Sequence, residues 1–96
     1  MTTVRITRFR TEPANEQAMI EKRAVLIAAV RESYPGLTEA RLGRLDDGSW
    51  VDHWYWESAE HMQKALAAAP TITEAHAAFA LTTDSTAESA EIVSVI

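Results

Sequence analysis

The chain has 96 residues, of which 47% are apolar, and it carries a formal net charge of −5. This length suits a single domain spanning residues 1–96. The nine Lys and Arg residues form no long basic run, so the sequence lacks the electrostatic signature of a nucleic-acid-binding protein. The absence of cysteine excludes disulfides, thiolate catalysis and thiolate metal ligands.

The apolar content is high for so small a domain, because a chain of this size buries only about 60–65% of its unfolded surface. A second copy of the chain would bury the surplus, so we expect a homodimer. No apolar stretch approaches the length of a membrane-spanning helix, and the first residues lack the apolar segment of a signal peptide. We therefore expect a cytoplasmic protein with no membrane partner.

The first predicted element is a strand over Thr3–Arg10, in which Val4 and Ile6 alternate with polar residues. Arg8 shares the face of Val4 and Ile6, where it would pair with a carboxylate or an anionic ligand. A structural ion pair is the alternative role for this arginine.

A long helix is predicted from Asn15 to Ser33, because Pro13 and Asn15 are typical of a helix start and Pro35 ends the run. Its apolar residues recur at helical spacing and would form the buried face: Met19, Leu26, Ile27, Val30 and Tyr34.

Asp47-Gly48 separates two strand-like runs, residues 37–46 and 49–57, and predicts a hairpin with a two-residue type I′ turn. That turn would pair Leu45 with Trp50, Gly43 with Asp52 and Arg41 with Trp54. One face would then carry Trp50, Asp52, Trp54, Trp56, Leu45, Gly43, Arg41 and Glu39. The other would carry Val51, His53, Tyr55, Arg44, Leu42 and Ala40. Both faces contain large apolar groups, so we expect both to be covered.

A second helical region begins at Ser58, a typical N-cap residue, and Pro70 interrupts it. Thr71 and Glu74 have the spacing of a capping box, which predicts a short helix over residues 72–80. This helix would place Ile72, Ala75, His76 and Phe79 on one side. Residues 81–89 are polar and predict a loop, and residues 90–96 predict the last strand.

The predicted order is strand, helix, strand, strand, helix, strand. Right-handed connections then produce an α+β fold of the ferredoxin-like βαββαβ type, with a four-stranded antiparallel sheet and helices on one face.

At this point the sequence resembles the antibiotic biosynthesis monooxygenase family of the dimeric α+β barrel superfamily. The resemblance rests on the strand 4–9, the helix ending at Tyr34-Pro35-Gly36, the segment 54–58 (Trp-Tyr-Trp-Glu-Ser) and the segment 73–76 (Thr-Glu-Ala-His). It implies two sheets that meet face to face, helices outside, and a pocket between sheet and helices in each subunit. Members of this family include cofactor-free quinol or anthrone oxygenases and haem-degrading enzymes, so the function has to be inferred from the residues of the site.

Three indoles on alternate residues, Trp50, Trp54 and Trp56, would form an apolar wall suited to a planar ligand. The alternative is that they fill the core. Asp52 lies among them, and Arg41 would pair with it or lie over Trp54. That ion pair would be either structural or part of a ligand site.

His76 lies where, by the resemblance, the haem-degrading branch places its iron-ligating histidine. It would ligate haem or act as a general base. The alternative is a histidine bonded to a neighbouring backbone group. The haem-degrading branch also uses a Trp where this chain has Leu66 and an Asn for which Thr7 is the nearest match. Both departures argue against haem degradation.

His53 and Tyr55, on the opposite hairpin face, would bind a phenolate or assist proton transfer, with an interface role as the alternative. His61 is expected to be exposed. The three histidines are far apart in sequence and predict no metal site.

The sequence thus favours a cofactor-independent monooxygenase acting on a small aromatic, quinol or polyketide-like substrate. His76 or Asp52 would be the base, and the indoles would form the walls. Arg41, Arg8 and Thr7 would help to hold the substrate. A non-catalytic ligand-binding or structural dimer is the first alternative, and a haem-handling protein is the second.

Overall fold

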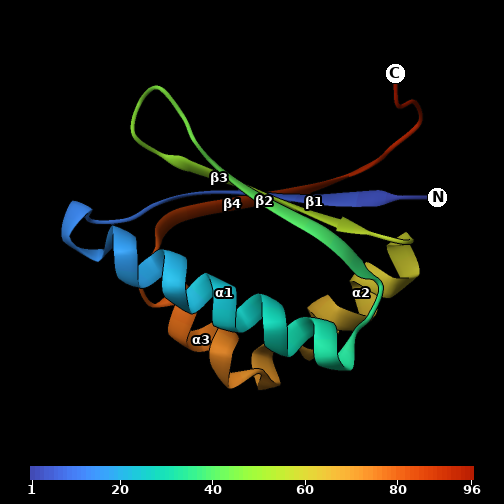
Figure 1. Ribbon diagram of the computed structural model, residues 1–96, viewed down its shortest axis with the longest axis horizontal. Coiled ribbons are helices and arrows are strands. Elements are labelled where there is room, and N and C mark those ends of the chain that lie inside the picture. The colour runs from blue at the N-terminus through green and yellow to red at the C-terminus, as the bar shows by residue number, and fades with distance from the viewer.

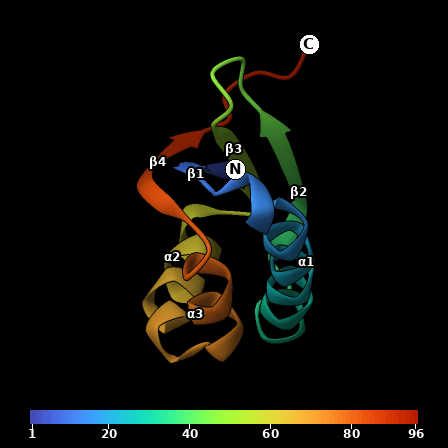
Figure 2. The same ribbon diagram turned by 90° about the vertical axis from the view of Figure 1, so that its left-hand side faces the viewer.

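The computed structural model describes residues 1–96 and consists of one sheet layer and one helix layer (Figures 1 and 2). The sheet is antiparallel with strand order β2-β3-β1-β4, and its strands are β1 (Thr3–Arg10), β2 (Leu37–Arg44), β3 (Trp50–Trp56) and β4 (Thr83–Glu91). The helices are α1 (Glu16–Ser33), α2 (Ala59–Ala68) and α3 (Thr73–Phe79), with short 3-10 turns at Pro13–Asn15 and Ala69–Thr71. The predicted ferredoxin-like fold is confirmed.

Helix α1 follows its predicted pattern. Met19, Leu26 and Val30 are buried, and the chain leaves the helix at Tyr34, whose backbone N–H donates to the carbonyl of Val30 at 2.7 Å. Spacings of seven and four residues place these apolar side chains on one stripe, which packs on the sheet and on α3. Periodicity was therefore sufficient to predict the longest helix.

Helices α2 and α3 are formed as expected, and of the side chains predicted to share one side of α3 only Ala75 is fully buried. Ser58 caps α2, its Oγ accepting from the backbone N–H of His61 at 3.2 Å. The side chains buried from α3 are Ala75 and Ala78, whereas Phe79 is 57% exposed. The two alanines allow α3 to lie close against the core. No capping box forms, because the hydroxyl of Thr71 donates to the carbonyl of Ala68 instead.

The predicted hairpin register is wrong by one residue. The loop has three residues, since Leu45 N–H donates to Ser49 O at 2.7 Å and Gly48 N–H donates to Leu45 O at 3.0 Å. Gly48 has φ +85°, so the loop is a type I turn followed by a left-handed glycine. As a result Leu42 lies opposite Asp52.

A slip of one residue moves every side chain of one strand to the other face of the sheet. Ala40 therefore lies opposite Trp54, and Arg41 lies opposite His53. Arg44 lies opposite Trp50, with its guanidinium 4.5 Å from the centre of the indole ring. Arg41 and Gly43 consequently lie on the face away from the three tryptophans.

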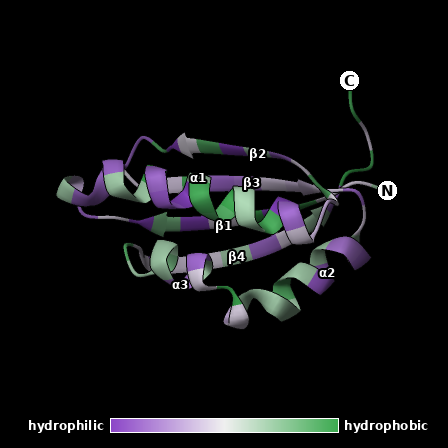
Figure 3. Cartoon of the chain, turned by 60° about the horizontal axis from the view of Figure 1, so that its bottom comes forward, coloured by the Kyte–Doolittle hydropathy of each residue, from purple (hydrophilic) through white to green (hydrophobic).

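The predicted bounds of the last strand are also wrong. Strand β4 covers Thr83–Glu91, a stretch of polar and small residues that are all exposed. It is an edge strand, held by its backbone pairing with β1 rather than by a buried side-chain face. Of the strand predicted over residues 90–96, only residues 90 and 91 lie in β4, and the apolar tail 92–96 extends beyond the sheet. It is the green C-terminal segment in Figure 3.

The helices cover only one face of the sheet (Figure 2). On that face the buried core forms two clusters, one around Trp56, Leu26 and Val30, and the other around Trp50, Phe9 and Met19. No element of the chain covers the opposite face, here called the open face, which carries among others Ile6, Val51, His53 and Tyr55. No helix is long and apolar enough to cross a bilayer.

Candidate functional site

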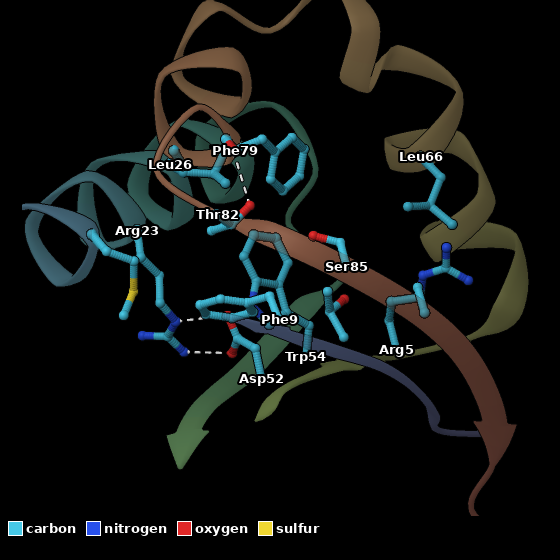
Figure 4. Close-up of a pocket in the computed structure, with 14 residues that line it drawn as sticks. Arg5, Phe9, Arg23, Leu26, Asp52, Trp54, Leu66, Phe79, Thr82 and Ser85 are labelled. Carbon is cyan, nitrogen blue, oxygen red and sulfur yellow. Dashed lines mark hydrogen bonds and ion pairs between the residues drawn. The ribbon is translucent and has the colours of Figure 1, made fainter. Parts of the chain in front are cut away.

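A cavity of about 320 Å³ lies between the sheet and the helices (Figure 4). Residues of β1, β3, β4 and all three helices line it, and members of both core clusters are among them. The larger apolar side chains of the lining are Phe9, Met19, Leu26, Trp54, Leu66 and Phe79. The polar lining consists of Arg5, Thr7, Arg23, Asp52, Thr82 and Ser85. The tryptophan-bearing face of the hairpin is thus the one that borders a cavity.

Asp52 and Arg23 form a bidentate ion pair at the edge of this cavity. Arg23 Nε donates to Asp52 Oδ2 at 2.8 Å, and a terminal guanidinium nitrogen donates to Oδ1 at 2.9 Å. The side chains are only 17% and 11% exposed. Charge-assisted bonds in this paired geometry are among the stronger ones in proteins. Each oxygen of Asp52 thus accepts one hydrogen bond from Arg23 and keeps a further acceptor position.

The predicted pairing of Asp52 with Arg41 is therefore wrong, because the register slip places Arg41 on the open face. There its guanidinium bonds to Glu39, and this hydrogen bond raises the pKa of Arg41. Arg8 is exposed on the same face. Neither arginine lines the cavity, so the structure gives no support to either as a ligand contact.

The arginines that do line the cavity are Arg5 and Arg23. Arg23 lies on the same stripe of α1 as Met19 and Leu26, four residues after one and three before the other. A charged residue in an apolar stripe was the signal that could have identified it. Arg5 alternates with Val4 along β1 and so faces the helices with Thr7, which was predicted to contact the substrate and lines the cavity.

The three tryptophans have different environments. Trp54 lines the cavity, whereas Trp50 and Trp56 are buried in the two core clusters. The indole N–H groups of Trp50 and Trp56 are buried without a hydrogen-bond partner. Two of the indoles therefore fill the core, and Trp54 alone provides a wall for a ligand.

Comparison with known protein families identifies the family of this chain. Residues 2–80 match the family model described as antibiotic biosynthesis monooxygenase. The chain belongs to this family. A search of curated protein sequences found no significant match.

Solved monooxygenase structures share the fold of this family member. SnoaB, a cofactor-independent oxygenase from Streptomyces nogalater, superposes with a TM-score of 0.74 at 23% identity, over 99% of this chain and 96% of SnoaB. The monooxygenase ActVA-Orf6 of Streptomyces coelicolor, in complex with nanaomycin D, has a TM-score of 0.75 at 21% identity, over 98% of this chain and 89% of that one. A variant of MhuD with two manganese protoporphyrin IX molecules per active site has a TM-score of 0.67 at 24% identity, over 98% of this chain and 97% of the MhuD chain.

His76 of this family member lies outside the cavity. It is exposed on α3, and its Nε2 lies 2.7 Å from the carbonyl oxygen of Pro70, to which it donates. This is the backbone-bonded alternative. A histidine in this position contacts neither the cavity nor a group bound there, and Leu66 is the lining residue contributed by α2. The geometry therefore supports His76 neither as a base nor as an iron ligand.

The other two histidines are also distant from the cavity lining. His53 stacks on Tyr55 on the open face, with ring centres 6.4 Å apart and an interplanar angle of 18°. His61 is exposed, as predicted, and its Nδ1 lies 2.6 Å from Ser58 Oγ. The structure brings together no group of three side chains able to hold a metal ion.

Proposed function

We propose that this protein is a cofactor-independent monooxygenase that oxidises a small planar aromatic or polyketide-like molecule in the cavity between sheet and helices. The observation that carries the proposal is the cavity itself. Its lining is mainly apolar, with Trp54, Phe9 and Phe79 as aromatic surfaces. Its volume, about 320 Å³, lies at the lower end of the range for small-molecule sites, about 300–1,000 Å³.

The proposed chemistry balances without a cofactor when the substrate supplies the electrons. For the model compound anthrone, the substrate first loses a proton, and the resulting carbanion-enolate reduces dioxygen. One oxygen atom replaces two hydrogens at the reacting carbon as a carbonyl, and the other leaves as water. The protein would hold the ring, exclude water and stabilise the developing anion.

The type of reaction described for two structural relatives supports this proposal. SnoaB is described as a cofactor-independent oxygenase, and ActVA-Orf6 is a monooxygenase seen with nanaomycin D. The MhuD likeness leaves haem binding as an alternative, but His76 lies outside the cavity and offers no axial ligand within it. We expect His76→Ala to leave anthrone oxidation unchanged, and a large loss would return the base role to this histidine.

We also propose that two copies of the chain pair through their open faces. The open face combines half-buried Ile6, Val51, His53 and Tyr55, and nothing in the chain covers it. A sheet with apolar groups on both faces normally has both covered. A second sheet laid against it would provide the cover expected from the apolar surplus of the sequence.

Oxygen consumption with anthrone tests the proposed reaction. Ala87 is an exposed residue of β4 that lines the cavity opposite Thr7, so Ala87→Trp would fill the cavity from its edge without overpacking the core. Ala67→Trp adds the same indole at an exposed position of α2 outside the cavity. We expect the wild-type protein and Ala67→Trp to accelerate oxygen uptake above the protein-free rate, and Ala87→Trp to lose the acceleration.

The alternative of a non-catalytic binding protein makes a different prediction. Anthrone and related quinones would raise the melting temperature of the wild-type protein but not of Ala87→Trp, and none of the proteins would change the rate of oxygen uptake. That result would retain the binding cavity and reject the monooxygenase.

A further inference from the structure

The charges that line the cavity do not balance. Two guanidinium groups, those of Arg5 and Arg23, face one carboxylate, that of Asp52. Arg23 and Asp52 engage each other through two hydrogen bonds and leave that end of the cavity electrically neutral. Arg5 carries the remaining charge.

Arg5 has no acidic partner within the chain. Its one side-chain hydrogen bond runs from Nη1 to the hydroxyl of Ser89 at 3.0 Å, and no carboxylate oxygen lies within 4.0 Å of its guanidinium nitrogens. The guanidinium group has five N–H donors in a planar fork, so most of them remain free. The side chain is half-buried, and burial of a charge is costly unless the charge is paired.

The residues around Arg5 indicate which kind of ligand group would pair with its guanidinium. Arg5 lies directly opposite Trp54 in the β1–β3 ladder, and its guanidinium extends towards Leu66 at one end of the cavity (Figure 4). A planar molecule lying against Trp54 would therefore present one edge to this cation. The fork of an arginine matches a carboxylate in shape as well as charge.

We propose that Arg5 selects aromatic ligands that carry a carboxylate, binding that group at the Leu66 end of the cavity while the rings lie against Trp54. The proposal rests on the ligand cavity of the proposed function and names its preferred substrate class: aromatic or polyketide-like acids, which the cavity would bind more tightly than neutral molecules such as anthrone. The neutral Arg23–Asp52 pair at the other end offers such an acid no competing cation.

A matched pair of small ligands tests this inference. 2-Naphthoic acid and 2-naphthamide have the same ring system and similar shape, but only the acid is ionised at neutral pH. We expect calorimetry to show wild-type protein binding the acid roughly ten to a hundred times more tightly than the amide, the factor typical of a charge-assisted bond. Added salt should reduce the difference in affinity between the acid and the amide, because it screens the charge of Arg5.

Arg5→Gln should abolish the preference for the acid, so that 2-naphthoic acid and 2-naphthamide bind this variant with similar affinity. Arg8→Gln is the control, because Arg8 is on the same strand but is exposed on the open face. It should keep the full preference. Arg5→Lys retains the positive charge without the planar guanidinium group, so it should keep part of the preference for the acid. This variant provides a second test if Arg5→Gln folds poorly.

The outcomes separate this inference from the proposed function. Equal binding of acid and amide by the wild-type protein, or no binding of either, would overturn the role of Arg5. An acid preference that disappears in Arg5→Gln, together with no acceleration of the oxidation of either anthrone or an anthrone that carries a carboxylate, would uphold Arg5 and reject the monooxygenase.

Discussion

The ion pair between Arg23 and Asp52 should make a large contribution to stability that depends on both partners. Replacing Arg23 by Met strands the Asp52 carboxylate in a site where its side chain is only 11% exposed. Removing one partner of a buried pair costs about 3–5 kcal/mol. Because both side chains retain some exposure, we expect a loss near the lower end, about 3 kcal/mol.

The double variant should behave differently from the single ones. Arg23→Met combined with Asp52→Leu replaces both charges by apolar groups, and such replacements are often neutral or stabilising. We expect the double variant to lie within about 1 kcal/mol of the wild type, so the cycle should show strong coupling between the two positions.

Urea denaturation followed by tryptophan fluorescence would measure these free energies, at one fixed protein concentration because the proposed dimerisation would contribute to apparent stability. Single and double variants that all lie within about 0.5 kcal/mol of the wild type would refute the reasoning, because this is the range of ordinary surface substitutions.

Three further predictions concern other parts of the fold. Gly36→Ala should cost about 1–3 kcal/mol in urea denaturation, since a Cβ there would lie 2.7 Å from the Cβ of His61; an unchanged midpoint would contradict this contact. Hydrogen bonds from Ser49 hold the pKa of Asp47 below its ordinary value, so the stabilisation is present above the unfolded pKa and is lost as pH falls through the folded one. Asp47→Asn should lose this dependence in melting curves between about pH 6 and about pH 2, and identical profiles would refute it. Tyr55→Glu should convert a dimer to a monomer in light scattering, and a monomeric wild-type protein would reject pairing through the open face.

The fold was predictable from the sequence wherever burial imposes a period. Helix α1 has its buried residues at helical spacing, so it was predicted nearly to its ends. The bounds of β1 were predicted from the alternation of Val4 and Ile6 with polar residues in the sequence, although burial does not alternate along this strand. Strand β4 has no such pattern, because it is an exposed edge strand whose structure depends on pairing with β1. A local pattern cannot reveal a partner that lies some 80 residues away.

The hairpin error has a local cause with a distant consequence. A glycine after an aspartate suits both a two-residue type I′ turn and a three-residue loop ending in a left-handed glycine. The choice of loop decides which face each residue of β2 occupies, and so it gave Asp52 the wrong partner. Arg23 could have been found instead as the one charge within the apolar stripe of α1.

The candidate site was predictable only in part. Asp52, Trp54 and Thr7 do line the cavity. Alternation along β3 could not separate Trp54 from Trp50 and Trp56, because all three share a face and only the packing of the helices leaves space above one of them. Arg5 alternates with Val4 and Ile6 in the sequence, but its position in the cavity and its lack of an acidic partner required the three-dimensional structure.

Isotopic labelling tests the central claim most directly. Anthrone would be oxidised under ¹⁸O₂ with the wild-type protein and with Ala87→Trp, and the anthraquinone formed would be examined by mass spectrometry after subtraction of the protein-free reaction. A monooxygenase acting in this cavity predicts that wild-type protein accelerates formation of a product carrying one new ¹⁸O atom, and that Ala87→Trp does not. Equal product formation in both proteins, or no acceleration by either, would contradict an oxygenase site between the sheet and the helices.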